Sequence, residues 1–392
     1  MKKRLTTLML TLLALTSCAQ SAEPISDLTQ RVFERAREQL LLLDRNVSAK
    51  GPGVFPRSFE ADTVRTSDLD WWCSGFFPGS LWYVYQYTGD VKARERAVAF
   101  TESVGRLIGR HTDHDLGFQL TCSFGNGWRL SGREEYADVL RKGATQLSER
   151  FDPAIGCIRS WDFGKWNFPV IIDNMMNLEL LLRYGSPEEQ QIAVTHARKT
   201  LENHFRPDYT SWHLVDYAPD GSVRGKQTVQ GLSDDSAWAR GQAWALYGYT
   251  MLLDQNAVAS DDALWDLFAG QAEGIARMLL SRLPEDGIPQ WDFDAEPGAL
   301  KDVSAAAIMA SAFLRLASLT SDEGLEKDCR DMAERQIRTL ASPQYLAEPG
   351  EIGGFLLRHS VGNLPSGSEV DVPLTYADYY FLEALLRLNG QL

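Results

Sequence analysis

Apolar residues in this chain recur at intervals of three and four, the spacing of amphipathic helices. In residues 24–46, for example, Leu28, Val32, Ala36 and Leu40 share one face. Further along, helices that are apolar on every side alternate with charged, one-sided helices. The first apolar helix is predicted directly after residues 70–79 and ends at Tyr85, and the others are predicted at 115–131, 173–184, 236–253, 303–319 and 376–388. Charged helices are predicted at 24–46, 91–110, 133–150, 187–204, 261–282 and 322–340.

This alternation predicts the fold. Helices that are apolar all round are buried, and one-sided helices form an outer layer. Six of each predict an all-α fold, an (α/α)6 toroid or barrel of six inner and six outer helices. No alternating run is long enough to predict a sheet domain, and no internal linker interrupts the pattern. The long loops before the inner helices would then meet at one end, where their polar and aromatic residues favour a carbohydrate cleft: 48–74, 111–115, 152–172, 206–235, 284–301 and 342–375.

The first residues are typical of a secretion signal. A basic start is followed by an apolar run that is too short to span a bilayer as a mature helix. Leu15-Thr16-Ser17-Cys18 resembles the lipobox of bacterial lipoproteins, in which the cysteine is acylated. We therefore expect a lipoprotein signal peptide at residues 1–17, lipidation of Cys18, and a single domain at 18–392. An ordinary signal cleaved within residues 19–22 is the alternative.

The net charge and the spacing of the cysteines argue against a nucleic-acid-binding protein and against a metal site. The net charge is −14, and removal of the three basic residues of the signal changes it to −17, so nucleic acid is not an expected partner. Cysteines 73, 122, 157 and 329 are far apart and form no C-x-x-C pair, so we expect no metal site. Buried free thiols are the expectation for them, and a single disulfide is the alternative.

Two aspartates begin inner helices at the same end of the predicted toroid. Asp173 follows three apolar residues and precedes two methionines, and Asp115 opens the second inner helix. Burial in an apolar setting raises a carboxyl pKa, and two adjacent carboxylates cannot both ionise easily. One of the pair is therefore expected to stay protonated near neutral pH. The alternative is that both are helix N-caps and that His114 is a core histidine.

The fourth inner helix begins with a second candidate group. Trp238 offers a face for a sugar ring, and Arg240 offers a fork suited to a carboxylate. Alternatively, Arg240 pairs with Asp234 or Asp235. Trp244 is expected in the core.

These segments resemble glycoside hydrolase family 88, the unsaturated glucuronyl hydrolases. The resemblance covers roughly residues 68–388 and includes the expected (α/α)6 architecture. It is carried by Trp72-x-x-Gly75-Phe76-x-Pro78-Gly79, His114-Asp115-x-Gly117-Phe118, Asp173-Asn174-Met175-Met176-Asn177, Ser236-x-Trp238-x-Arg240-Gly241-Gln242-Ala243-Trp244 and the segment 368–385.

The resemblance implies an exo-acting enzyme on oligosaccharides left by polysaccharide lyases. Such an enzyme hydrates the 4,5 double bond of the terminal unsaturated uronate, without a nucleophile or a cofactor, and the resulting hemiketal opens and releases the partner sugar. Asp173 would protonate C4 and help water to add at C5. Asp115 would orient the substrate and keep Asp173 protonated. The implied sugar-binding residues are Trp72, His114, Trp161, His213, Gln230, Trp238 and Arg240.

Some assignments stay open at this stage. Val229 stands where family members often have a histidine. The loop 359–368, with Ser366 and Ser368, could hold a sulfate through neutral donors or could be only a turn. Alternative functions are an unsaturated rhamnogalacturonyl hydrolase, an inverting glycosidase, or a non-catalytic glycan-binding lipoprotein. Because Ala19 follows the lipobox cysteine, we expect an outer-membrane anchor that faces the periplasm.

Overall fold

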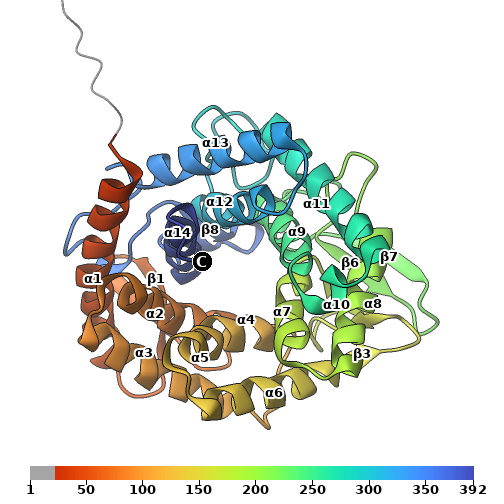
Figure 1. Ribbon diagram of the computed structural model, residues 1–392, viewed down its shortest axis with the longest axis horizontal. Coiled ribbons are helices and arrows are strands. Elements are labelled where there is room, and N and C mark those ends of the chain that lie inside the picture. Colours follow the sequence, from red (N-terminus) through yellow and green to blue (C-terminus); the bar gives the residue numbers. More distant parts are fainter. Residues whose placement is uncertain (1–22) are drawn as a thin grey trace, which may run out of the picture.

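Two concentric rings of helices surround a common axis in the computed structural model, which describes residues 23–392 (Figure 1). The inner ring consists of α2 (Phe76–Thr88), α4 (Leu116–Leu120) continued by η3 (Thr121–Gly125) and α5 (Asn126–Ser131), α7 (Asn174–Tyr184), α9 (Ala239–Leu252), α12 (Val303–Ala317) and α14 (Thr375–Leu388). The outer ring consists of α1 (Ile25–Ser48), α3 (Val91–Val104), α6 (Glu134–Ser148), α8 (Pro187–Asn203), α11 (Asp262–Arg282) and α13 (Glu323–Leu340). The predicted (α/α)6 barrel is confirmed. The predicted signal and Cys18 lie outside the described residues.

The two kinds of helix differ in burial as their patterns predict. Every residue of α9 and α12 is buried, whereas α13 buries only one stripe and exposes its charged residues. The inner ring closes where α14 packs on α2. A Cβ on Gly79 would lie 2.5 Å from the Tyr379 ring, so only glycine permits this close approach. The hydroxyls of Tyr83 and Tyr379 are hydrogen-bonded across the same contact at 2.9 Å.

The second inner helix is not continuous, contrary to the prediction for 115–131. A five-residue π-helical segment, η3, separates α4 from α5. Two hydroxyls donate back to carbonyls of the preceding turn: Thr121 to Gly117 at 2.7 Å and Ser123 to Gln119 at 2.5 Å. Such side-chain bonds compete with the regular helical ladder and accompany local widening of a helix.

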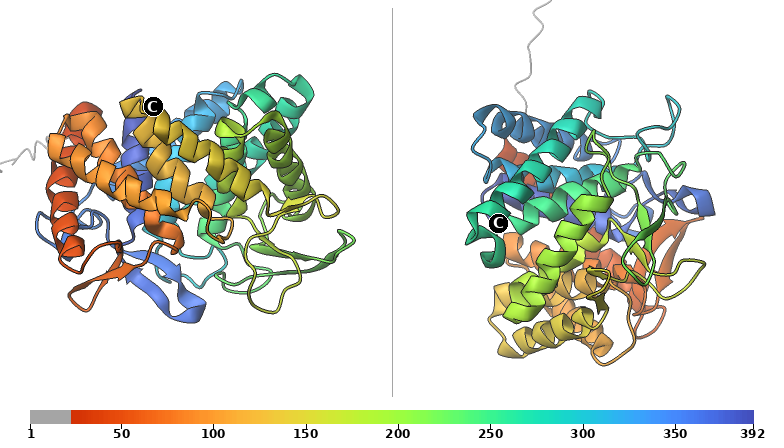
Figure 2. Two further views of the ribbon diagram at one scale, coloured as in Figure 1. Left: turned by 90° about the horizontal axis from the view of Figure 1, so that it is seen from below. Right: turned by 90° about the vertical axis from the view of Figure 1, so that its right-hand side faces the viewer.

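The long loops contain short strands, which the sequence pattern did not predict. They form antiparallel pairs β1–β2, β3–β4 and β8–β9 and the three-stranded sheet β5–β6–β7. These strands project from one end of the barrel (Figure 2). Their bounds are β1 Phe55–Glu60, β2 Thr63–Ser67, β3 Phe151–Asp152, β4 Cys157–Ile158, β5 Pro169–Ile171, β6 Leu214–Tyr217, β7 Val223–Gln227, β8 Ser360–Asn363 and β9 Ser368–Val372. Short helical turns complete the connections: η1 Trp72–Gly75, η2 Gly105–Leu107, α10 Asn256–Ala259, η4 Ile352–Gly354 and η5 Leu364–Ser366.

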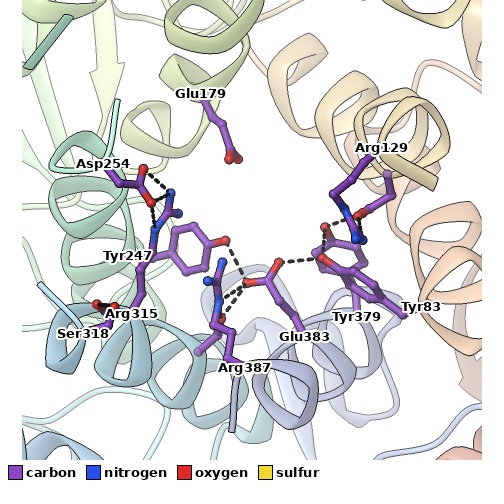
Figure 3. Close-up of polar contacts among 12 residues, drawn as sticks. Tyr83, Arg129, Glu179, Tyr247, Asp254, Arg315, Ser318, Tyr379, Glu383 and Arg387 are labelled. Carbon is purple, nitrogen blue, oxygen red and sulfur yellow. Dashed lines mark hydrogen bonds and ion pairs between the residues drawn. The ribbon is translucent and has the colours of Figure 1, made fainter. Parts of the chain in front are cut away.

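A buried carboxylate links several helices of the inner ring. Glu383 of α14 accepts hydrogen bonds from Tyr83 of α2 (2.8 Å), Tyr247 of α9 (2.8 Å) and Ser311 of α12 (2.5 Å) (Figure 3). Burial raises its pKa, but the charge of Arg387 and these hydrogen bonds outweigh burial and leave the pKa below its usual value. One charged group therefore ties four inner helices together. We call Glu383 and these four partners the Glu383 cluster.

The four cysteines of the described region, Cys73, Cys122, Cys157 and Cys329, are buried free thiols, as expected. Within residues 23–392 no helix combines the length and the apolar character needed to cross a bilayer.

Candidate active site

Asp115 and Asp173 occupy equivalent positions, each immediately before an inner helix. Both stand at the N-cap of their helix, α4 and α7 respectively, yet neither side chain makes a capping hydrogen bond. The alternative that they serve as helix caps is therefore wrong. Their side chains are 18% and 13% exposed, so both carboxyls are largely buried and remain within reach of a ligand.

The first turns of α4 and α7 are in direct contact. A Cβ on Gly117 would lie 2.5 Å from the Cα of Asn177, so only glycine fits there. Asn177 Oδ1 accepts the Phe118 N–H at 2.8 Å, and this bond joins the two helices. The contact brings Asp115 and Asp173 into one electrostatic neighbourhood.

Burial dominates the titration of both acids. Burial first, and then the charge of Asp173, raise the pKa of Asp115 from 3.8 to about 7, against the lowering effects of Asn177 and Arg150. Burial likewise raises the pKa of Asp173 to about 7, against the lowering effects of Arg240 and Trp244. At neutral pH the pair therefore holds a proton that can be donated and taken back.

Each aspartate lies beside a neutral histidine. His114 Nε2 is 3.4 Å from Asp115 Oδ1, and His213 Nε2 is 3.8 Å from Asp173 Oδ2. Burial lowers the pKa of His114 to about 4 and that of His213 to about 3. Neither imidazole is charged at neutral pH.

Hydrogen bonds on the other ring nitrogen fix the tautomer of both histidines. His213 Nδ1 accepts the backbone N–H groups of Val229 (3.0 Å) and Gln230 (3.3 Å), so its proton is on Nε2. Asn177 Oδ1 is already an acceptor, so its amide nitrogen faces His114 Nδ1 at 3.4 Å. Both histidines therefore present an N–H toward a carboxylate. Val229, the departure from the family pattern, contributes here through its backbone.

Arg240 is buried, with its side chain 1% exposed, and it pairs with Asp302 at 3.1 Å instead of with Asp234 or Asp235. Its guanidinium also donates to the carbonyls of Val361 and Gly362. These bonds fix Arg240 between α12 and the β8–β9 hairpin, where its charge acts on Asp173.

Trp238 does not present an open face for a sugar, which corrects the prediction. Its side chain is only 2% exposed, because the His213 ring packs 4.7 Å from its ring and the Arg240 guanidinium lies 4.6 Å from its ring centroid. Trp238 therefore positions these two polar side chains.

The other predicted binding residues lie on the surrounding loops. Trp72 is half-buried in η1, with its ring 4.7 Å from Tyr376. Trp161 is half-buried and connects to the segment before α4 through its neighbour Ser160, whose carbonyl accepts the His114 N–H at 3.1 Å. Gln230 donates to the Gly362 carbonyl at 3.1 Å. Ser368 Oγ accepts from Arg57 at 3.2 Å.

Sequence reasoning missed three contributors. Asn177 ends the segment 173–177, and its sequence context did not indicate that it joins α4 to α7. Asp302 precedes the fifth inner helix just as Asp115 and Asp173 precede theirs, so extending that pattern would have found it. Trp244 is fully buried in the core, as predicted, but the sequence did not indicate that it lowers the pKa of Asp173.

Comparison with known proteins gives concordant results. No family model matches the chain. A curated unsaturated glucuronyl hydrolase of Formosa agariphila is 41% identical over 351 residues, which cover 86% of this chain and 85% of the relative. The crystal structure of an unsaturated glucuronyl hydrolase specific for heparin superposes with a TM-score of 0.85 at 44% identity, covering 92% of this chain and 97% of that chain. A substituted form of the Streptococcus agalactiae enzyme, complexed with dGlcA-GalNAc6S, superposes with a TM-score of 0.77 at 27% identity, covering 93% and 92%.

Proposed function

The chain belongs to the unsaturated glucuronyl hydrolase family, and from this premise we propose how its residues carry out the reaction. It is a glycoside hydrolase that removes the 4,5-unsaturated uronic acid from the non-reducing end of lyase-generated oligosaccharides. Family membership supports this activity over the rhamnogalacturonyl hydrolase and binding-protein alternatives.

Asp173 is the proposed acid and base. Its protonated carboxyl donates a proton to C4 of the unsaturated ring, which leaves positive character at C5 shared with the ring oxygen. The resulting carboxylate then accepts a proton from the water that adds at C5. The product is a hemiketal, which opens and releases the partner sugar. The pKa of about 7 supports both steps, because a group near the working pH exchanges protons in either direction.

Asp115 is the proposed partner carboxylate. Its proximity to Asp173 makes it costly for both groups to ionise, so the pair retains one proton at neutral pH. The Nε2–H groups of His114 and His213 are proposed to donate to substrate oxygens or to whichever carboxylate is charged.

The substrate is an anion, and the chain has a net charge of −14. Binding therefore needs local positive potential, and two features supply it. The inner helices begin at this end, so their positive dipole ends point to the site. Arg240 is fixed beside Asp173, and its guanidinium has more donor hydrogens than its three bonds use. We propose that this buried charge attracts the uronate carboxylate through its electrostatic field.

Glycosaminoglycan fragments are the proposed substrates. The heparin-specific structure is 44% identical, so unsaturated heparin-type disaccharides are the first candidates, followed by chondroitin-type, hyaluronan-type and ulvan-type ones.

This proposal rests on the two buried aspartates, Asp115 and Asp173, whose side chains make no capping hydrogen bond. Loss of the double-bond absorbance of unsaturated disaccharides measures turnover. Asp173→Asn should reduce kcat by a factor of ~10²–10⁴ or more with the fold intact, because a general acid is lost. Asp261→Asn is the matched control. Asp261 also precedes a helix but caps it through the Leu264 N–H, a bond that asparagine also makes. An Asp173→Asn enzyme with a third of the wild-type rate would refute the assignment.

We also propose that Cys18 carries a lipid that anchors the enzyme to the outer membrane, facing the periplasm. The lipobox-like segment supports this location.

A further inference from the structure

An aromatic pair stands exposed beside the catalytic segment. Phe163 is 67% exposed, more than any other large apolar side chain of the described residues. It stacks on Trp161 with ring centroids 5.4 Å apart and an angle of 15° between the planes. A stacked pair that faces solvent contributes little to the core, but flat aromatic faces are suited to sugar rings.

The pair lines a cavity of about 300 Å³. His111, Asp113 and Asp162 also line it. Asp113 joins this cavity to the reaction centre, because its Oδ1 accepts the Asp115 N–H at 3.0 Å. The volume is at the lower end of the range for small-molecule sites and suits a single sugar ring.

One buried arginine fixes the walls of this cavity. The Arg150 side chain is 9% exposed and donates to the carbonyls of Thr112 (2.8 Å) and Arg159 (2.9 Å) and to Asp162 Oδ2 (2.8 Å). These bonds hold the loop before α4 and the loop that carries Phe163 in one relative position. The cavity therefore exists before a ligand arrives, which lowers the ordering cost of binding.

A second, larger groove of about 900 Å³ adjoins this cavity. It shares His111, Thr112 and Asp162 with the first cavity. Its cationic side chains include Arg110 and Lys142, and Lys142 makes no ion pair within residues 23–392. The groove also contains Glu149 and Asp152, so it is mixed in charge and not uniformly basic.

We propose that the cavity and the groove form one binding track for the sugar rings beyond the cleaved linkage. The ring that follows the disaccharide unit stacks on Phe163, and an acidic group of a later ring lies against Lys142. The enzyme then acts on unsaturated anionic tetrasaccharides and hexasaccharides more efficiently than on the disaccharide. This inference rests on the proposed function and specifies the length of its substrate.

The first test compares kcat/KM for the unsaturated disaccharide and tetrasaccharide of one polymer. Phe163→Ala should lower the tetrasaccharide value by roughly three- to tenfold, the effect of one lost aromatic stack, and leave the disaccharide value unchanged. Leu267→Ala is the matched control, since Leu267 is 40% exposed on α11, away from the track. Equal losses on both substrates, or no loss on either, would overturn the proposal.

The second test addresses the groove. Lys142→Ala should weaken turnover of the hexasaccharide two- to fivefold at low salt and remove part of its salt dependence, because an exposed charge acts through a screened field. Lys92→Ala on the outer helix α3 is the control and should change neither. A hexasaccharide rate and salt dependence that match those of the wild type would exclude Lys142 from the track.

A binding measurement separates this inference from the proposed function. In the Asp173→Asn background, calorimetric titration with the tetrasaccharide needs no turnover. Adding Phe163→Ala should weaken binding by the same three- to tenfold factor. Weakened binding, together with no hydrolysis of the unsaturated disaccharide by the wild-type protein, would refute the proposed function and keep the track. Unchanged binding together with normal disaccharide turnover would refute the track alone.

Discussion

Replacing Asp115 with asparagine should stabilise the protein at alkaline pH while it removes activity. The pKa of Asp115 rises from 3.8 to about 7 on folding, because burial and the charge of Asp173 disfavour its ionised form. Because this pKa is raised, Asp115 contributes its full stabilisation of the folded state below pH 3.8. The contribution is lost as the pH rises through about 7. Above that value the wild-type protein contains an unfavourable buried charge, which the neutral amide of Asn lacks.

The size of the effect follows from the shift. About three pKa units at ~1.36 kcal/mol each correspond to ~4 kcal/mol, and ~2–3 kcal/mol of this falls between pH 5 and pH 8. Relaxation around a side chain that is 18% exposed reduces these values, so we expect a gain of ~1–3 kcal/mol for Asp115→Asn at pH 8 relative to pH 5. Urea unfolding of both proteins at the two pH values measures it.

Asp378→Asn is an informative contrast. Burial also raises the pKa of Asp378 to about 7, but its two carboxylate oxygens accept the N–H groups of Leu356 (3.0 Å) and Leu357 (2.9 Å). An amide NH₂ would face one of these donors, so this variant should lose stability at both pH values. If Asp115→Asn changes the unfolding free energy equally at pH 5 and pH 8, the argument from buried charge is refuted.

Four further outcomes are expected. Asp302→Asn should raise KM for the uronate substrate severalfold more than it lowers kcat, because Arg240 loses its charged partner; an unchanged KM would count against that role. Gly117→Ala should lower the unfolding free energy by ~1–3 kcal/mol, since its Cβ would meet Asn177 at 2.5 Å; wild-type stability in thermal unfolding would contradict this contact. Ser366→Ala with Ser368→Ala should change the ratio of kcat/KM between sulfated and unsulfated disaccharides roughly 5- to 150-fold; equal slowing of both would mean that the loop is only a linker. Cys18→Ser should release the enzyme from the membrane fraction, and protease treatment of intact cells should spare the wild-type protein; digestion of it would refute the inward orientation.

The repeating helical pattern was sufficient to predict the barrel. Apolar residues on all sides of a helix, or on one side only, can be recognised in the sequence and indicate an inner or an outer helix. The position of Asp115 and Asp173 before adjacent inner helices also followed from the sequence. The sequence did not predict that their side chains make no capping hydrogen bond. An aspartate at an N-cap position looks the same in sequence whether or not its side chain accepts a hydrogen bond from the helix. The π-helical turn was missed for a similar reason, since the Ser123 hydroxyl that bonds to the Gln119 carbonyl carries no special pattern.

The strands and the partner of Arg240 depend on contacts between distant segments. β8 and β9 pair with each other across a short turn, and β8 supplies two carbonyls to Arg240, yet neither strand is long enough to show alternation. Asp302 lies 62 residues from Arg240 in the chain, whereas Asp234 and Asp235 are only six and five residues away and were therefore the expected partners. The sequence also did not predict that Trp238 is buried, because His213, which covers its ring, comes from another loop.

The Glu383 cluster has a kinetic consequence. Glu383 and its hydroxyl partners Tyr83, Tyr247 and Ser311 join four of the six inner helices through buried hydrogen bonds, so we expect no route for a sugar between these helices. Products must therefore depart through the same mouth by which the substrate enters. With the uronate bound beside Asp173 as proposed, we expect the partner sugar to leave first and the uronate-derived product to leave last. That product should consequently inhibit competitively against the substrate, and the partner sugar should not.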